Sequence, residues 1–187
     1  MHFLNYMLSY IRFLFQLVRA PTKGWEDISA SGKSYSEIQA KGYFPLIILT
    51  AFCEFIPLIY SPSLTFVNAL ENVIAIGGGL YVSIYAARLF LDIVLTRFID
   101  AKMNILKINI LAIYMLGLDC LYRILANLIP ASMTFLSFLP LISIIILFKS
   151  AKYLYVPDDR IINYLAISFT GVVIIPASVC ALLMLII

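Results

Sequence analysis

Five long, continuous apolar runs are the feature that most constrains what this chain can fold into. They lie at about residues 43–60, 73–95, 105–129, 133–148 and 161–187. Each run is close to the length of helix that crosses about 30 Å of hydrocarbon at 1.5 Å per residue. The runs are continuous rather than alternating, and they are longer than the strands of a membrane barrel. We therefore predict an all-α fold, a polytopic bundle of five transmembrane helices.

Composition supports a membrane location for this bundle. Of the 187 residues, 63% are hydrophobic and only 12% are charged. A soluble domain is about 25% charged and needs those charges to cover its surface. We predict that residues 1–42 form a cytoplasmic N-terminal segment and that residues 43–187 form the five-span membrane domain.

The basic residues predict the orientation of the spans. Every lysine or arginine in a loop falls before the first run, between the second and third, or between the fourth and fifth, and these residues are Arg12, Arg19, Lys23, Lys33, Lys41, Arg97, Lys102, Lys107, Lys149, Lys152 and Arg160. Basic residues accumulate in cytoplasmic loops. The N-terminus is therefore predicted to be cytoplasmic and the C-terminus outside.

The N-terminal segment has the pattern of an interfacial helix. Its polar residues, spaced by three or four positions, form one narrow stripe: Asn5, Ser9, Arg12, Gln16 and Arg19. Such a helix suits the plane of the cytoplasmic interface, with Arg12 and Arg19 near lipid phosphates and Trp25 at headgroup depth. The alternative is a helix packed on the neighbouring spans with its polar stripe outward. Ser34 and Glu37 form a capping-box pattern, which predicts a short cytoplasmic helix before the first span.

Four polar residues inside the runs are the candidate intramembrane site. Glu54 lies about eleven residues into its run, or roughly 16 Å, close to the midplane. It is either a proton-linked or cation-contacting group, or a protonated side chain that bonds between helices. Asp119, Arg123 and Asn127 share one face of the third run. This stripe either lines an outward-facing vestibule or is a self-neutralised contact within the bundle. We expect Glu54 and Asp119 to lie at different depths.

Small residues in the second run predict close helix packing. They recur at every fourth position, at Ala75, Gly79, Ser83 and Ala87. This spacing lets a neighbouring helix approach closely in lipid. The alternative role for the glycine triplet at 77–79 is a hinge. Pro140 and Pro176 predict kinks in the fourth and fifth spans.

Catalytic, metal and nucleic-acid functions have no support in the sequence. The single histidine is His2, and the three cysteines, Cys53, Cys120 and Cys180, lie in apolar runs where they suit packing. The chain has no Gly-x-Ser-x-Gly elbow and no dense basic cluster. We expect no enzymatic activity, no cofactor, no metal site and no nucleic-acid partner. The expected partners are membrane lipids, further copies of the chain or other membrane proteins.

The segment Arg19–Ile28, with sequence RAPTKGWEDI, resembles the Pro-x-x-x-Trp-x-x-Ile stretch that leads into the first span of bacterial members of the Yip family, the Ypt/Rab-interacting membrane proteins. The order of five spans is similar too. The resemblance implies a five-helix domain without enzymatic activity in the bacterial cytoplasmic (inner) membrane. The Asp-Leu-Tyr-Gly-Pro motif of eukaryotic members is missing, which argues against GTPase binding.

Two functions follow as expectations. The first is a non-enzymatic scaffold or membrane-organisation protein. The alternative is a small transporter, channel or lipid-moving protein that uses Glu54, with Asp119 and Arg123 along its outer path, and that works as a homodimer.

Overall fold

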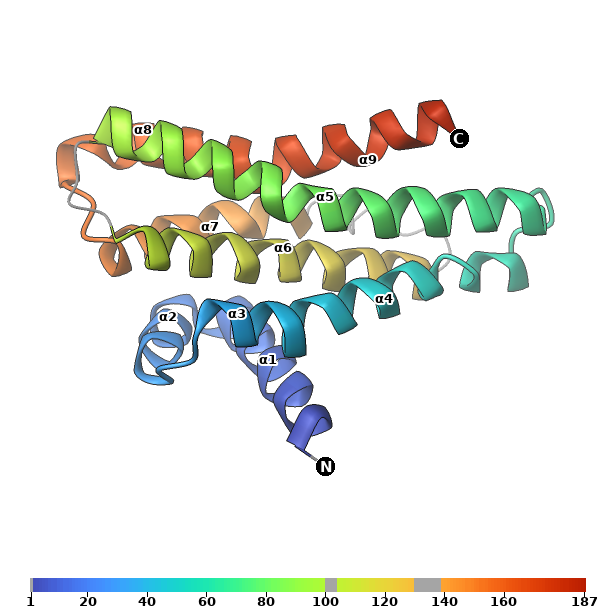
Figure 1. Ribbon diagram of the computed structural model, residues 1–187, viewed down its shortest axis with the longest axis horizontal. Helices are drawn as coiled ribbons and strands as arrows, with labels where there is room; N and C mark the ends of the chain where they lie inside the picture. Colours follow the sequence, from blue (N-terminus) through green and yellow to red (C-terminus); the bar gives the residue numbers. More distant parts are fainter. Residues whose placement is uncertain (1, 100–103, 130–138) are drawn as a thin grey trace.

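The computed structural model describes residues 2–99, 104–129 and 139–187, and these parts fold into α-helices joined by short turns (Figure 1). The all-α prediction is therefore confirmed. In chain order the α-helices are α1 (His2–Arg19), α2 (Pro21–Ala30), α3 (Tyr35–Ile38), α4 (Phe44–Cys53), α5 (Phe66–Ile99), α6 (Ile105–Leu128), α7 (Leu139–Tyr153), α8 (Ile161–Phe169) and α9 (Ile175–Ile186).

Within the described residues, four helical segments are long and apolar enough to cross a membrane: Tyr35–Ile59, Phe66–Ile99, Ile105–Leu128 and Asp158–Ile186. Large apolar side chains also cover the outside of these segments, as expected where the neighbour is lipid, among them Ile48, Phe52, Ile74, Leu89, Ile93, Leu182 and Leu185. By length and composition this is the architecture of a multi-pass helical membrane protein. The predicted run at 133–148 lies partly outside the described residues, and its described part belongs to α7.

The helix that contains the first apolar run begins before residue 43. Ser34 caps α3 by accepting a hydrogen bond from the backbone N–H of Glu37 at 3.3 Å, which confirms the predicted short helix and the Ser34 half of the capping-box pattern. The helix then continues without a break through a π-helical turn, η1 (Gln39–Tyr43), into α4. The predicted boundary between residues 42 and 43 therefore falls inside one continuous helical segment.

Each of the two π turns in the described residues lies just before a proline. Turn η1 ends two residues before Pro45, and η5 (Thr170–Ile174) ends two residues before Pro176. Proline lacks a backbone N–H, and its ring clashes with the carbonyl four residues earlier, so a wider turn relieves the conflict. The irregularity predicted at Pro176 thus takes the form of this π turn. Pro140 is the second residue of α7 and lies next to the undescribed residues 130–138.

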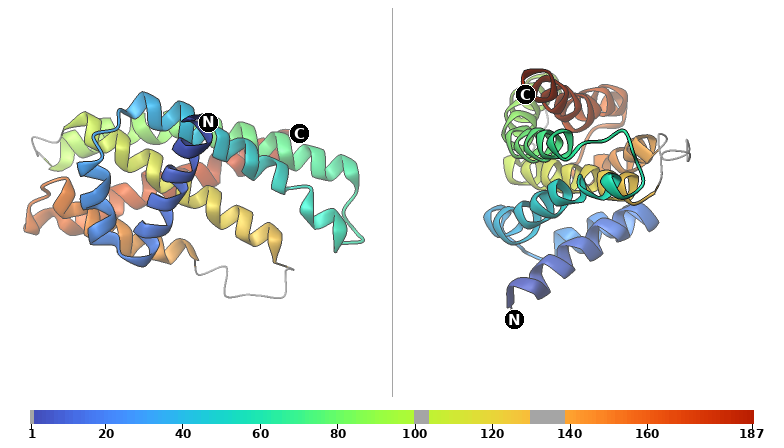
Figure 2. Two further views of the ribbon diagram at one scale, coloured as in Figure 1. Left: turned by 90° about the horizontal axis from the view of Figure 1, so that it is seen from below. Right: turned by 90° about the vertical axis from the view of Figure 1, so that its right-hand side faces the viewer.

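Helix α6 is the centre of the bundle. In its most apolar stretch 61% of residues are buried, against 22% to 39% in the other three candidate spans. Helices α5 and α9 lie on one side of it and α1 lies on the opposite side (Figures 1 and 2). All three cysteines are buried and free, as predicted for small packing residues.

Helices α1 and α2 form a cap that lies across one side of the bundle, against α6 (Figures 1 and 2). Helix α1 crosses the spans at a steep angle (Figure 2) and buries Tyr10, Leu14 and Leu17 against them. The Tyr10 hydroxyl donates to the Ile113 carbonyl of α6 at 2.7 Å. The cap is therefore fixed to the central helix by a buried hydrogen bond as well as by apolar contact.

Part of the predicted polar stripe of α1 contacts protein. Gln16 donates to Asp27 of α2, and Lys33 donates to the Ser9 hydroxyl at 2.7 Å. Arg12 and Arg19 are exposed, as an interfacial helix requires. Ser9 and Gln16 of the stripe therefore bind α1 to the segments that follow it, whereas Arg12 and Arg19 face outward.

Candidate functional site

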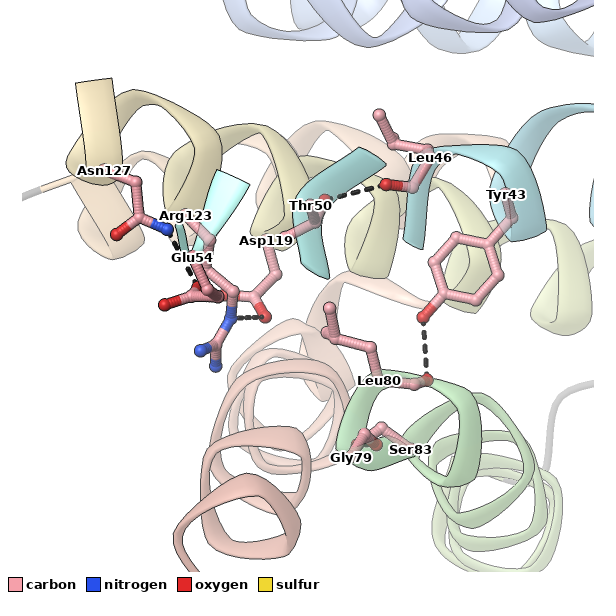
Figure 3. A network of polar contacts seen from close by, with 10 residues as sticks. All are labelled: Tyr43, Leu46, Thr50, Glu54, Gly79, Leu80, Ser83, Asp119, Arg123 and Asn127. Atoms are coloured by element: carbon pink, nitrogen blue, oxygen red, sulfur yellow. Dashed lines mark hydrogen bonds and ion pairs between the residues drawn. The ribbon is translucent and has the colours of Figure 1, made fainter. Parts of the chain in front are cut away.

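The polar site lies where the first span meets the C-terminal part of α6. Helix α4 ends at Cys53, and Glu54 is the residue that terminates it. Asn127 lies one residue before the end of α6, and its side-chain amide donates to the Glu54 carboxylate at 2.8 Å (Figure 3). The Tyr60 hydroxyl donates to the backbone carbonyl of Asn127 at 3.0 Å. Two side-chain hydrogen bonds thus join the end of the first span to the last turn of α6.

A charged pair lies beside this contact. The Arg123 Nε donates to the Asp119 carboxylate at 2.9 Å within α6, and 24% of the arginine side chain and 31% of the aspartate side chain are exposed. Figure 3 shows Glu54 next to this pair. One guanidinium therefore lies near two carboxyl groups. If both carboxyl groups are ionised, the cluster carries one net negative charge and can attract a proton or a small cation.

Glu54 lies near the end of its helical segment. The continuous helix starts at Tyr35, and a rise of 1.5 Å per residue puts Glu54 roughly 28 Å from that start. Its hydrogen bond with Asn127 puts Glu54 beside the last turn of α6, and its depth in a membrane stays a prediction. Glu54 bonds to Asn127 while Asp119 pairs with Arg123, so the four side chains line up along one face of α6 (Figure 3), and the expectation that Glu54 and Asp119 lie at different depths stays a prediction.

Two tyrosines at the ends of the first apolar run were missed as polar contacts. The Tyr43 hydroxyl, fully buried, donates to the Leu80 carbonyl of α5 at 3.0 Å (Figure 3), and Tyr60 contacts α6 as described above. A buried phenol needs an acceptor. The signal was therefore present in the sequence, since Tyr43 and Tyr60 bracket the run.

The small-residue stripe of α5 packs against other spans of the same chain. Ala75, Gly79, Ser83 and Ala87 are all buried. A Cβ atom added at Gly79 would lie 2.6 Å from the Cys180 Sγ and 3.1 Å from the Cys180 Cα in α9. The Ser83 hydroxyl is satisfied inside α5 by the Gly79 carbonyl at 2.6 Å. Helix α5 is unbroken from Phe66 to Ile99, so the glycine triplet is helical in this structure.

Trp25 is buried in the cap, with only 2% of its surface exposed. Its indole N–H donates to the Ile146 carbonyl of α7 at 3.2 Å, and its ring stacks on Tyr153 with centroids 5.5 Å apart. The indole is therefore enclosed by protein, and its expected position at headgroup depth stays a prediction. The indole is buried because α2 packs directly on the end of α7.

The described residues contain no group of three histidine, cysteine, aspartate or glutamate side chains that could hold a metal ion. Compared with protein-family models, with curated proteins and with solved structures, the chain matches none. The resemblance to the Yip family stays a prediction.

Proposed function

We propose that this chain is a non-enzymatic, five-span membrane protein that organises lipids or other membrane proteins at the cytoplasmic face of a bacterial inner membrane. In this proposal α7 is the fourth span, the cap of α1 and α2 is cytoplasmic, and α1 lies along the interface. The resemblance of Arg19–Ile28 to bacterial Yip proteins is part of the proposal.

The arrangement of basic residues supports the orientation. The ends of α5 and α7 and the starts of α6 and α8 lie at the same end of the bundle (Figure 1), and this end carries Arg97, Lys107, Lys149, Lys152 and Arg160. The sequence has no lysine or arginine at residues 60–72, 124–148 or 161–187, which include the opposite end. A bundle whose loop lysines and arginines all lie at one end is oriented with that end in the cytoplasm.

The observation that carries the proposed role is the internal pairing of the polar cluster. Glu54 bonds to Asn127, and Asp119 pairs with Arg123, at 2.8 and 2.9 Å within one chain. Polar groups at membrane depth are costly unless they are paired, and paired groups fix helices against each other. The cluster then acts as a structural joint between the first span and α6.

Transport is the rival function, and the shape of the first span favours it. Helix α4 ends at Cys53, with Glu54 as its C-cap, and a short 3-10 helix, η2 (Ile56–Ile59), follows. Interrupted helices with ionisable groups occur at the substrate sites of transporters. In this version Glu54 exchanges a proton or a cation, and a second copy of the chain completes the path.

Two substitutions at one position separate these functions. Glu54→Gln keeps an acceptor for the Asn127 amide, whereas Glu54→Leu removes it. If the cluster is structural, the Gln variant unfolds like wild type in detergent and the Leu variant loses about 1–3 kcal/mol. Liposomes containing wild type or Glu54→Gln then show proton and labelled-lipid leakage equal to empty liposomes. Flux in wild type that Glu54→Gln abolishes would establish transport instead.

A further inference from the structure

We infer that a lysine-lined cavity between α2, α6 and α7 binds the phosphate-bearing headgroup of an anionic phospholipid from the cytoplasmic leaflet. The inference deepens the proposed function by naming the lipid class, and it rests on the proposed orientation.

The cavity has the size and position of a headgroup site. It has a volume of about 510 Å³, and its walls include Thr22 and Glu26 of α2 together with Lys107, Lys149 and Lys152. A neighbouring hollow of about 600 Å³ shares Lys149 and Lys152 with it. Small-molecule sites of about 300–1,000 Å³ are typical. Both hollows lie at the basic end of the bundle, where lipid headgroups meet the spans.

Charge in the cavity favours an anion. Three lysines face one carboxylate, Glu26, and the three lysines have no ion-pair partner among the described residues. Lys149 and Lys152 are exposed, so both ammonium groups are free to move onto a ligand. Basic pockets between spans on the cytoplasmic side bind phosphate headgroups.

Lys107 lines the cavity and is held in place by two tyrosines. Its ammonium donates to the Tyr153 carbonyl at 3.2 Å and lies 4.3 Å from the centroid of the Tyr155 ring. Tyr155 has a left-handed backbone, with φ of 57°, although 78% of its surface is exposed. A non-glycine residue adopts this conformation only against steric repulsion between its Cβ atom and the backbone. The strained residue thus forms one wall of the cavity over a lysine.

An apolar stripe on α7 leads directly to the lysines, and this favours a lipid over a soluble phosphate. Leu141, Ile145, Phe148 and Lys152 are spaced by four, three and four residues and therefore share one face. The three apolar residues are 52%, 56% and 47% exposed. A phosphate held by Lys149 and Lys152 would leave its acyl chains along this stripe, in the hydrocarbon.

The test is native mass spectrometry of the purified full chain in a neutral detergent, titrated with dioctanoyl phosphatidylglycerol, dioctanoyl phosphatidylcholine and glycerol 3-phosphate. Wild type is expected to bind phosphatidylglycerol at least ten-fold more tightly than phosphatidylcholine. The double variant Lys149→Gln/Lys152→Gln should lose roughly ten- to thirty-fold in affinity, and Lys149→Arg/Lys152→Arg should retain it. The control Lys23→Gln/Lys41→Gln removes two exposed charges elsewhere in the N-terminal segment and should bind like wild type.

Equal affinity for the two lipids, or unchanged phosphatidylglycerol binding in the double Gln variant, would overturn the inference. Displacement of phosphatidylglycerol by an equal concentration of glycerol 3-phosphate would assign the cavity to a soluble phosphate and overturn the lipid assignment. Because membrane orientation and flux are measured separately, loss of lipid preference in a correctly oriented, silent protein refutes this inference alone.

Discussion

Replacing Gly79 with alanine tests whether the small-residue stripe holds α5 to α9 within one chain. The new Cβ would lie 2.6 Å from the Cys180 Sγ and 3.1 Å from its Cα, so α9 must shift. Overpacking of this kind costs about 1–3 kcal/mol. Alanine also regains about 1 kcal/mol of helix propensity. The net expectation is a variant up to about 2 kcal/mol less stable than wild type.

Gly78→Ala is the matched control, because it lies in the same helix and gains the same propensity. Its Cβ would meet only the Leu183 Cδ1, at an ordinary distance of 3.8 Å. The propensity gain therefore cancels in the difference between the two variants, which should be about 1–3 kcal/mol.

The assay is chemical unfolding of both variants in the same detergent, with the free energy of unfolding compared. Gly79→Ala as stable as Gly78→Ala would refute the packing of α5 on α9 described here. If Gly79→Ala instead left the monomer's stability unchanged and abolished a dimer, the stripe would serve contact between copies.

Three further predictions concern the cap and the buried polar contacts. Trp25, the single tryptophan, should give blue-shifted fluorescence that acrylamide quenches poorly, because its indole is 2% exposed; emission typical of solvated indole would contradict the packing of α2 on α7. Tyr43→Phe should lower the free energy of unfolding by about 0.5–1.5 kcal/mol through loss of the bond to Leu80, and an unchanged value would mean that this bond contributes nothing. Arg123→Gln should destabilise the protein by about 1–3 kcal/mol because it leaves the Asp119 carboxylate unpaired, and adding Asp119→Asn should recover part of that loss; strictly additive losses would show that the pair is uncoupled.

The sequence predicts the helices well because each one is determined locally. Apolar runs of the right length, the Ser34 cap and the turn residues between runs depend on a few neighbouring residues. Two boundaries shift for the same reason. Helix α5 covers Phe66–Ile99 rather than 73–95, and α3 joins α4, because a helix continues past its apolar part until a breaker ends it.

The sequence predicts which residues form the polar cluster, but it does not predict the contact between Glu54 and Asn127. The shared face of Asp119, Arg123 and Asn127 follows from the helical period alone, and the Asp119–Arg123 pair forms as the four-residue spacing requires. The contact between Glu54 and Asn127 depends on the vertical register of two helices, which no local pattern encodes. The burial of Trp25 against α7 is likewise a contact between residues far apart in sequence.

The most direct test of the five-span account is the side of the membrane on which the end of the chain lies. Single cysteines at Ser29, Ser63, Lys152 and Ile187, in a background without the three native cysteines, would be labelled with a membrane-impermeant maleimide in cells and in inverted vesicles. If α7 crosses the membrane, Ser63→Cys and Ile187→Cys react from outside, and Ser29→Cys and Lys152→Cys react only in inverted vesicles. Labelling of Ile187→Cys on the same side as Ser29→Cys would mean four spans, and it would contradict both the orientation and the cytoplasmic lysine cavity.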